Sequence, residues 1–161
     1  MILISHRGNI NGCNFEKENT HEYIQQAIDA GFHVEIDVWL KNNQLFLGHD
    51  QPETPVYLDW LIERKEKLWV HTKNAESLFY LTSNTELTVF FHEEEKYSII
   101  NNGRNNSGTI IKGVVWAHNL EKLNKNCIIP LLSKNDLRKK PTVEILGVCS
   151  DYIELFKNEN R

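Results

Sequence analysis

The residues best suited to chemistry lie in the first half of the chain, and the first of them are two carboxylates. Glu35 and Asp37 are separated by one residue within the apolar run His33–Val38. Because successive side chains of a strand point to opposite faces, both carboxylates should project from the same face. Two adjacent buried carboxylates are costly unless cations neutralise them. The pattern therefore predicts a hard divalent metal bound through oxygens. The alternative is a pair of salt bridges to inward-facing arginine or lysine.

Histidines form the second group. Those at or near the ends of apolar runs are His6, His49, His71, His92 and His118. In parallel α/β barrels, the active site is built at the carboxyl ends of the strands. A common location there would gather several groups that titrate near neutral pH. The alternative is that they are ordinary core histidines spaced by chance.

Two basic residues accompany the histidines. Arg7 follows the first apolar run and precedes Gly8, which would let the backbone turn closely past a bound phosphate. Lys73 would share a strand face with His71, so its ammonium could bind a phosphate oxygen or partly replace a metal. The alternative for Lys73 is a solvated lysine at the end of a strand.

Supporting polar residues follow the same runs. Glu18 lies just before Asn19 and Thr20, either of which could instead cap the helix that follows. Asp50 comes directly after His49, where it could orient the imidazole or bind substrate hydroxyls.

The elements that must position these residues are short strands alternating with helices. The predicted strands are Ile2–Ser5, His33–Val38, Leu45–Gly48, Leu68–Thr72, Leu87–Phe91, Gly113–Ala117, Ile128–Leu132 and Ile145–Cys149. Their nearly continuous apolar character is typical of parallel strands that are buried on both faces. They predict a compact (β/α)8 TIM barrel with shortened or missing helices, because a full barrel of this type needs roughly 250 residues.

The helices are less regular than the strands. The predicted helices are Thr20–Ala30, Leu58–Lys65, Ala75–Leu81, Glu93–Ile100 and Leu120–Lys125. The polar turn Lys41–Gln44 is too short for a parallel crossover, so an extended or hairpin-like path is expected there. Asn101–Gly108 should be an exposed loop.

Composition limits the class of protein. The chain has 161 residues, of which 40% are hydrophobic and 25% charged, and this predicts one globular domain over residues 1–161. A net charge of −4 argues against nucleic acid as a partner. The three cysteines lack a CxxC spacing, so free thiols are expected. With no apolar segment long enough to insert stably into a membrane, the expected location is the cytoplasm.

The ordered set of residues resembles the N-terminal signature of the glycerophosphodiester phosphodiesterase family, within the PLC-like phosphodiesterase superfamily. The matching pieces are His6-Arg7-Gly8, Glu18-Asn19-Thr20, Ala27 to Gly31, Glu35-x-Asp37 and His49-Asp50. Lys73, Trp116 and Ser150-Asp151-Tyr152 match the family more loosely. Linked pieces in the right order are much more specific than any one motif.

The resemblance implies an eight-stranded barrel that cleaves a phosphodiester with the help of a divalent metal. Glu35 and Asp37 would be metal ligands, while His6 and His49 would flank the phosphorus as general base and general acid. Arg7 would join Lys73 in stabilising charge on the phosphate oxygens. Attack by water and attack by a neighbouring substrate hydroxyl both stay open. The family also implies a role in lipid metabolism.

Two departures from the family pattern matter. Where the family has a third carboxylate ligand, this chain has His71, so the metal is expected to be Mg or Ca, with Mn or Zn if His71 is a ligand. The other possibilities are that a water fills the third position or that metal binding is lost. The connection 51–67 is also short, which predicts an open site for a small-molecule or polymer-linked phosphodiester.

Two other functions compete with the hydrolase. A phospholipase-like enzyme ranks lower, because the sequence shows no basic amphipathic helix. A non-catalytic barrel that binds a phosphorylated ligand is the main alternative, although a binding protein needs no acid–base pair. The sequence leaves the oligomeric state open.

Overall fold

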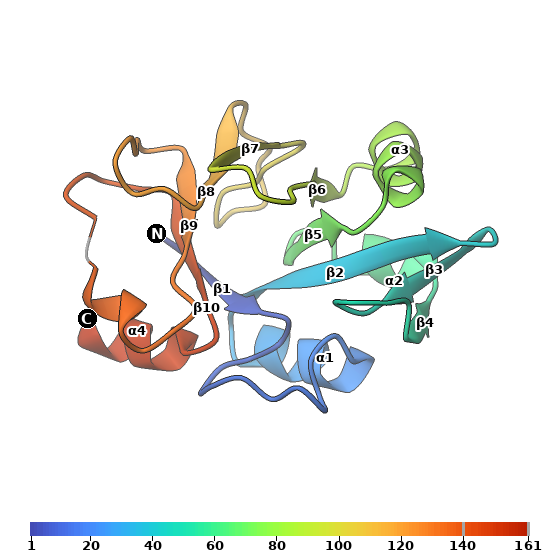
Figure 1. The fold of residues 1–161 in the computed structure, drawn as a ribbon, viewed down its shortest axis with the longest axis horizontal. Coiled ribbons are helices and arrows are strands. Elements are labelled where there is room, and N and C mark those ends of the chain that lie inside the picture. Colours follow the sequence, from blue (N-terminus) through green and yellow to red (C-terminus); the bar gives the residue numbers. More distant parts are fainter. Residues whose placement is uncertain (140, 161) are drawn as a thin grey trace.

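The computed structural model describes residues 1–139 and 141–160, which form a mixed α/β fold around one curled sheet (Figure 1). The strands that curl in parallel are β1 (Ile2–His6), β2 (His33–Lys41), β5 (Leu68–Thr72), β6 (Thr88–Phe90), β8 (Val114–Ala117), β9 (Cys127–Pro130) and β10 (Gly147–Ser150). The first strand is central, with β2 on one side and β10 on the other. This order brings the two ends of the chain together in one sheet.

Three further strands run antiparallel to their neighbours. They are β3 (Gln44–Leu47), β4 (Thr54–Val56) and β7 (Tyr97–Ile100). The turn between β2 and β3 has Asn42 and Asn43 at φ values of 50° and 62°, and two consecutive positive φ values are typical of a type I′ hairpin. The path through Lys41–Gln44 is therefore a hairpin, one of the two forms that the sequence predicts.

The curled sheet is a half-barrel, and its free edges approach each other at β6 and β7. Within the described residues they are joined by one isolated antiparallel bridge between Val89 and Asn101, with N···O distances of 3.0 and 2.8 Å. No helix separates β8 from β9 in this part of the chain. The structure thus confirms the α/β class and the shortened or missing helices that the sequence predicts. It does not confirm a full (β/α)8 barrel, because the sheet is a half-barrel and the predicted strand β3 is antiparallel.

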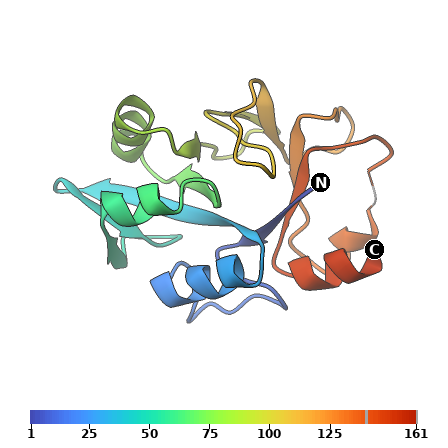
Figure 2. The same cartoon turned by 180° about the vertical axis from the view of Figure 1, so that it is seen from behind.

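The helices lie outside the curl (Figures 1 and 2). They are α1 (His21–Asp29), α2 (Leu58–Glu63), α3 (Ala75–Asn84) and α4 (Ile153–Glu159), with a short 3-10 turn at Asp136–Arg138. Thr20 caps α1 by accepting a hydrogen bond from the Tyr23 amide, as proposed for either Asn19 or Thr20. Asn74 caps α3 in the same way, through the Ser77 amide.

The predictions of secondary structure were right for all eight strands, with ends shifted by a few residues, and wrong for two helices. Glu93–Ile100 was predicted as a helix, but its second half is β7, whose burial alternates along Tyr97–Ile100. Leu120–Lys125 is irregular, because the Asn119 and Asn124 side chains accept the amides of Glu121 and Asn126. Such local bonds compete with a helix. The sequence analysis missed α4, β4 and β7.

The core follows the alternation expected for β2. Val34, Ile36 and Val38 face outward and pack with residues of α1, α2 and α3, so Glu35 and Asp37 must face the inside of the curl. The inside is closed at one end by an apolar layer that includes Ile2, Ile4, Trp69, Phe90, Trp116 and Ile128. Polar chemistry is thereby confined to the carboxyl ends of the strands.

Three predictions about the rest of the chain can be compared with the structure. Asn101–Gly108 is irregular as predicted, but Arg104 is buried in it and donates hydrogen bonds to the carbonyls of Gly108 and Glu86. All three cysteines, which lie within the described residues, are free. Among the same residues, no helix combines the length and the apolar character needed to cross a membrane.

Candidate active site

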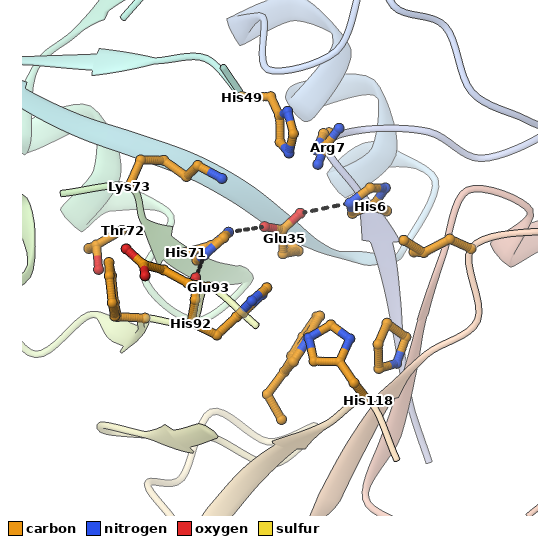
Figure 3. Close-up of a pocket in the computed structure, with 14 residues that line it drawn as sticks. His6, Arg7, Glu35, His49, His71, Thr72, Lys73, His92, Glu93 and His118 are labelled. Atoms are coloured by element: carbon orange, nitrogen blue, oxygen red, sulfur yellow. Dashed lines mark hydrogen bonds and ion pairs between the residues drawn. The ribbon is translucent and has the colours of Figure 1, made fainter. Parts of the chain in front are cut away.

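The carboxyl ends of the parallel strands surround a cavity of ≈ 290 Å³ (Figure 3). Of the predicted site residues, those that line it are His6, Arg7, Glu35, His49, His71, Lys73 and Trp116. The others, Asp37, Glu18, Asn19 and Asp50, do not line this cavity and contact the lining residues instead, Asn19 through its backbone amide, which donates to the Arg7 carbonyl. The structure therefore brings together side chains that are spread over most of the chain.

Asp37 is completely buried and lies among protein cations and amides. Its Oδ1 lies 2.9 Å from His71 Nδ1 and 3.5 Å from Lys73 Nζ. Its Oδ2 accepts a hydrogen bond of 2.9 Å from Asn19 Nδ2 and lies 2.9 Å from Arg7 Nε. Burial would raise the pKa of Asp37, but the hydrogen bond from His71 and the charge of Arg7 outweigh it and hold the pKa well below its usual value. Asp37 is therefore ionised, and the salt-bridge alternative holds for this carboxylate.

Glu35 behaves in the opposite way. It is 3% exposed, and its Oε2 is buried without a hydrogen-bond partner among the described residues. The nearest basic side-chain atoms are His6 Nε2, 3.8 Å from Oε2, and His71 Nδ1, 3.9 Å from Oε1 (Figure 3). Burial, followed by the charge of Asp37, raises the pKa of Glu35. The pKa values of two carboxyl groups on one strand face are thus shifted in opposite directions by their surroundings.

Glu35, Asp37 and His71 form a buried group that could hold a metal ion, because one ligand atom from each lies within 4.8 Å of the others. The orphaned Glu35 Oε2 has no partner that an ion would need to displace. His71 is different, because its Nδ1 contacts Asp37 and its Nε2 lies 3.2 Å from the His92 carbonyl oxygen. The donor set fits a divalent ion, provided that His71 and Lys73 release Asp37.

His6 is held from the opposite side by a residue near the end of the chain. Its Nδ1 lies 2.7 Å from Oδ1 of Asp151, which follows β10. Although burial lowers the pKa of His6, the hydrogen bond to Asp151 and the charge of Glu35 outweigh it and raise the pKa. Asn9, fully buried, donates a hydrogen bond of 2.8 Å to the same Asp151 oxygen.

Arg7 joins two carboxylates beside the cavity. Besides its ion pair with Asp37, Arg7 donates a hydrogen bond of 3.1 Å from Nη1 to Glu18 Oε2. Its backbone has a φ of 54°, and Gly8 follows with a φ of 92°. A side chain at Gly8 would meet Tyr23 Cδ1 at 2.8 Å, so the turn after β1 needs glycine there.

His49 lies at the mouth of the cavity, in the turn after β3. Its Nδ1 is 2.6 Å from Asp50 Oδ1, and its side chain is 42% exposed. Burial and the charge of Arg7 lower the pKa of His49. Gly48, at a φ of 148°, makes this turn possible, because a Cβ there would lie 2.2 Å from the Gln51 carbonyl oxygen.

The far wall of the cavity is mainly aromatic. His92 stacks on His71 with ring centroids 4.2 Å apart, and His118 meets the edge of His92 at 4.6 Å. Burial, together with the charge of His71, lowers the pKa of His92 to about 4. Trp116 stacks on Phe90 at 4.6 Å, and its buried indole nitrogen has no partner in the described part of the chain.

A second hollow of ≈ 370 Å³ adjoins the cavity at Arg7 and His49, which line both. Its other lining residues are Phe15, Glu18, Asn19, Asp50 and Glu53. Phe15 is 86% exposed at its rim. The site is therefore open on the side where the connection 51–67 is short.

The sequence analysis did not select two residues that contact the predicted site directly, Asn9 and Asp151. Asp151 lies in the segment Ser150-Asp151-Tyr152, which matches the family's closing segment, so the resemblance contained a signal for it. Asn9 directly follows His6-Arg7-Gly8, but an asparagine after a glycine usually indicates only a turn.

Comparison with known proteins supports the fold. No family model matches the chain, and neither does any curated protein. Among solved structures, the glycerophosphodiester phosphodiesterase of Thermotoga maritima resembles it with a TM-score of 0.51 and 16% sequence identity. The alignment covers 99% of this chain and 98% of that chain. The chain therefore shares the fold of that enzyme over nearly all of its length.

Proposed function

We propose that this chain is a phosphoric diester hydrolase of the glycerophosphodiester phosphodiesterase type, formed by one domain over residues 1–161. The observation that carries the proposal is the convergence of His6, Arg7, His49 and Lys73 on one cavity at the carboxyl ends of the strands. Two imidazoles and two fixed cations around one cavity are the groups needed to bind a phosphodiester and move its protons.

Arg7 and Lys73 bind the phosphate oxygens and stabilise the charge that develops on them. His6 and His49 act as the acid–base pair, one removing the proton of the attacking hydroxyl group and the other protonating the leaving oxygen. The attacking oxygen belongs to water or to a neighbouring hydroxyl of the substrate. The open side at Phe15 supports substrates that range from small molecules to polymer-linked phosphodiesters.

Glu35, Asp37 and His71 are the residues that would hold a divalent metal. Mg or Ca suits the two carboxylates, and Mn or Zn suits a site in which His71 is a ligand. A bound ion supplies positive charge that stabilises the phosphate oxygens in the transition state. The protein's own part is to hold Glu35 buried and unpaired, ready to accept a cation.

The second candidate is a barrel that binds a phosphorylated ligand without cleaving it. It is favoured by one observation, which is that Asp37 is already neutralised by Arg7, His71 and Lys73. Against it stands the acid–base pair, which simple binding does not need.

The test is hydrolysis of bis(p-nitrophenyl) phosphate and glycerophosphocholine by metal-stripped protein, with Mg, Ca, Mn and Zn added back one at a time. Cleavage that His49→Ala abolishes would establish a phosphodiesterase. Binding of inorganic phosphate by folded protein, with no cleavage under any of these conditions, would favour the second candidate.

A further inference from the structure

Asn9 is a buried residue that contacts two different parts of the proposed site through one nitrogen atom. Its Nδ2 donates a hydrogen bond of 2.8 Å to Asp151 Oδ1 and another of 2.8 Å to Glu18 Oε1. Its Oδ1 accepts the Asn14 amide at 3.0 Å, so the whole side-chain amide is engaged. A carboxamide is the neutral group that can donate to two carboxylates at once.

Each of the two carboxylates holds a different residue of the cavity. Asp151 contacts His6 Nδ1, so the other ring nitrogen, Nε2, is directed towards Glu35. Glu18 accepts from Arg7 Nη1, while Arg7 Nε lies against Asp37. Asn9 therefore lies between Asp151, which holds the proposed acid–base histidine, and Glu18, which holds the proposed phosphate-binding arginine.

The contact has an electrostatic consequence. Asp151 and Glu18 are both acidic, and without a donor between them they would repel each other. The two donor hydrogens of Asn9 let both carboxylates approach the same point while each keeps its own basic partner. Charge-assisted hydrogen bonds of this kind are roughly twice as strong as neutral ones.

We propose that Asn9 is a positioning residue that aligns His6, through Asp151, with Arg7, through Glu18. The role rests on the proposed function, because alignment of an acid–base group with a phosphate-binding group matters only for a reaction on a phosphate ester. Loss of groups that orient metal ligands reduces activity by about 10- to 100-fold, and we expect a loss of similar size when Asn9 no longer orients these two residues.

The kinetic test compares Asn9→Ala with variants of its two partners, on bis(p-nitrophenyl) phosphate. Asn9→Ala should lower kcat through His6 and raise KM through Arg7. In an Asp151→Ala background it should raise KM without lowering kcat further. In a Glu18→Ala background it should lower kcat without raising KM further. Additive effects on both constants in both backgrounds would overturn the proposal, because independent sites add.

The matched control is Asn105→Ala. The Asn105 side chain also makes several hydrogen bonds, because its Oδ1 accepts from the Ser107 amide, the Ser107 hydroxyl and the Thr109 amide. Its loop lies at the end of β1 opposite the cavity, where Asn106 donates to the Met1 carbonyl. Asn105→Ala should lower stability while leaving kcat and KM of the folded fraction unchanged. Should Asn9→Ala not fold, Asn9→Leu keeps nearly the same side-chain size and removes the two donors without adding a charge, and the same kinetic pattern is expected.

A readout that needs no catalysis separates this proposal from the function itself. In ¹⁵N-histidine-labelled protein, the Nδ1–H proton of His6, assigned by its absence in His6→Gln, should be protected from exchange by Asp151. Asn9→Ala and Asn9→Leu should remove this protection, and Asn105→Ala should preserve it. A protected His6 proton in folded Asn9 variants would overturn the proposal, whether or not the protein hydrolyses any ester.

Discussion

His71 Nδ1 lies 2.9 Å from Asp37 Oδ1, and the other nitrogen of the same ring lies 3.2 Å from the His92 carbonyl oxygen. A carbonyl can only accept, so Nε2 must donate to it. The ring can then offer a lone pair to a metal only through Nδ1, and only by giving up its hydrogen bond to Asp37. A residue that resembles a ligand by position would thus compete with a metal ion for Asp37.

Replacing His71 with a carboxylate should therefore strengthen binding of hard cations. His71→Glu is expected to raise the affinity for Mg and Ca by about tenfold or more, because both ions prefer oxygen ligands and respond to ligand charge. Affinity for Zn should fall, because an imidazole ligand is lost. Titration calorimetry on metal-stripped protein measures both. His118→Glu, which adds a carboxylate at the far wall, is the control, and equal gains in the two variants would contradict the assignment.

The two carboxylates of β2 should respond to neutralisation with opposite signs. In metal-free protein at pH 7, Glu35→Gln should raise the free energy of unfolding by about 1 kcal/mol, because burial raises the pKa of Glu35 and ionising it costs stability. Asp37→Asn should lower it by about 3–5 kcal/mol, because Arg7, His71 and Lys73 lose their shared partner.

The pH dependence of stability follows from the pKa shifts of these two carboxyl groups. Glu35, with a raised pKa, favours folding below its unfolded value of 4.5, and this contribution is lost as the pH rises through the folded value. Asp37, with a lowered pKa, favours folding above its unfolded value of 3.8, and this contribution is lost as the pH falls through the folded value. Urea denaturation between pH 3 and pH 8 should show the decline on the alkaline side flattened in Glu35→Gln. An unchanged curve in that variant would show that Glu35 is not ionising over this range.

Arg7 should not tolerate replacement by lysine. Its guanidinium contacts Asp37 and Glu18 through different nitrogen atoms, and a lysine ammonium is a point charge that cannot reproduce this arrangement. Arg7→Lys is expected to weaken binding of inorganic phosphate by about tenfold, or about 1.4 kcal/mol. Arg64→Lys, at the Trp60 ring outside the cavity, is the control. Equal affinity in Arg7→Lys and wild type would remove Arg7 from the phosphate site.

The gap between β6 and β7 should be the first part of the sheet to open. In the described residues, the backbone pairing across it is one isolated bridge between Val89 and Asn101, supplemented by side-chain hydrogen bonds, whereas Leu3 and Val148 lie in a continuous parallel ladder. Local opening is easiest where few contacts must be broken. Native-state hydrogen exchange should therefore find the amides of Val89 and Asn101 less protected than those of Leu3 and Val148. Equal protection would mean that the bridge opens only with the whole sheet.

The strands could be predicted well because they are short and continuously apolar, a pattern that can be recognised without knowing which strands pair with which. It failed where local pattern and tertiary context disagree. The polar start of Glu93–Ile100 suggested a helix, but pairing with β8 makes its second half a strand. For the site, the strand alternation of Glu35 and Asp37 was enough to place them inside. Asp151 was harder, since its partner His6 lies 145 residues away and only the folded sheet brings β10 beside β1.

Different halves of the chain form the two walls of the cavity, and this affects how such a protein can evolve. The groups proposed to act on the phosphate come from His6 to Lys73, and the opposite wall comes from Phe91 to Leu132. Mutations in the later stretch can reshape what the cavity accepts while the reacting groups are inherited intact. Descendants of one ancestral gene can thus diverge in the molecules they accept while the reaction stays the same. Asp151 limits that freedom, because His6 depends on this carboxylate, which follows the later stretch in the sequence.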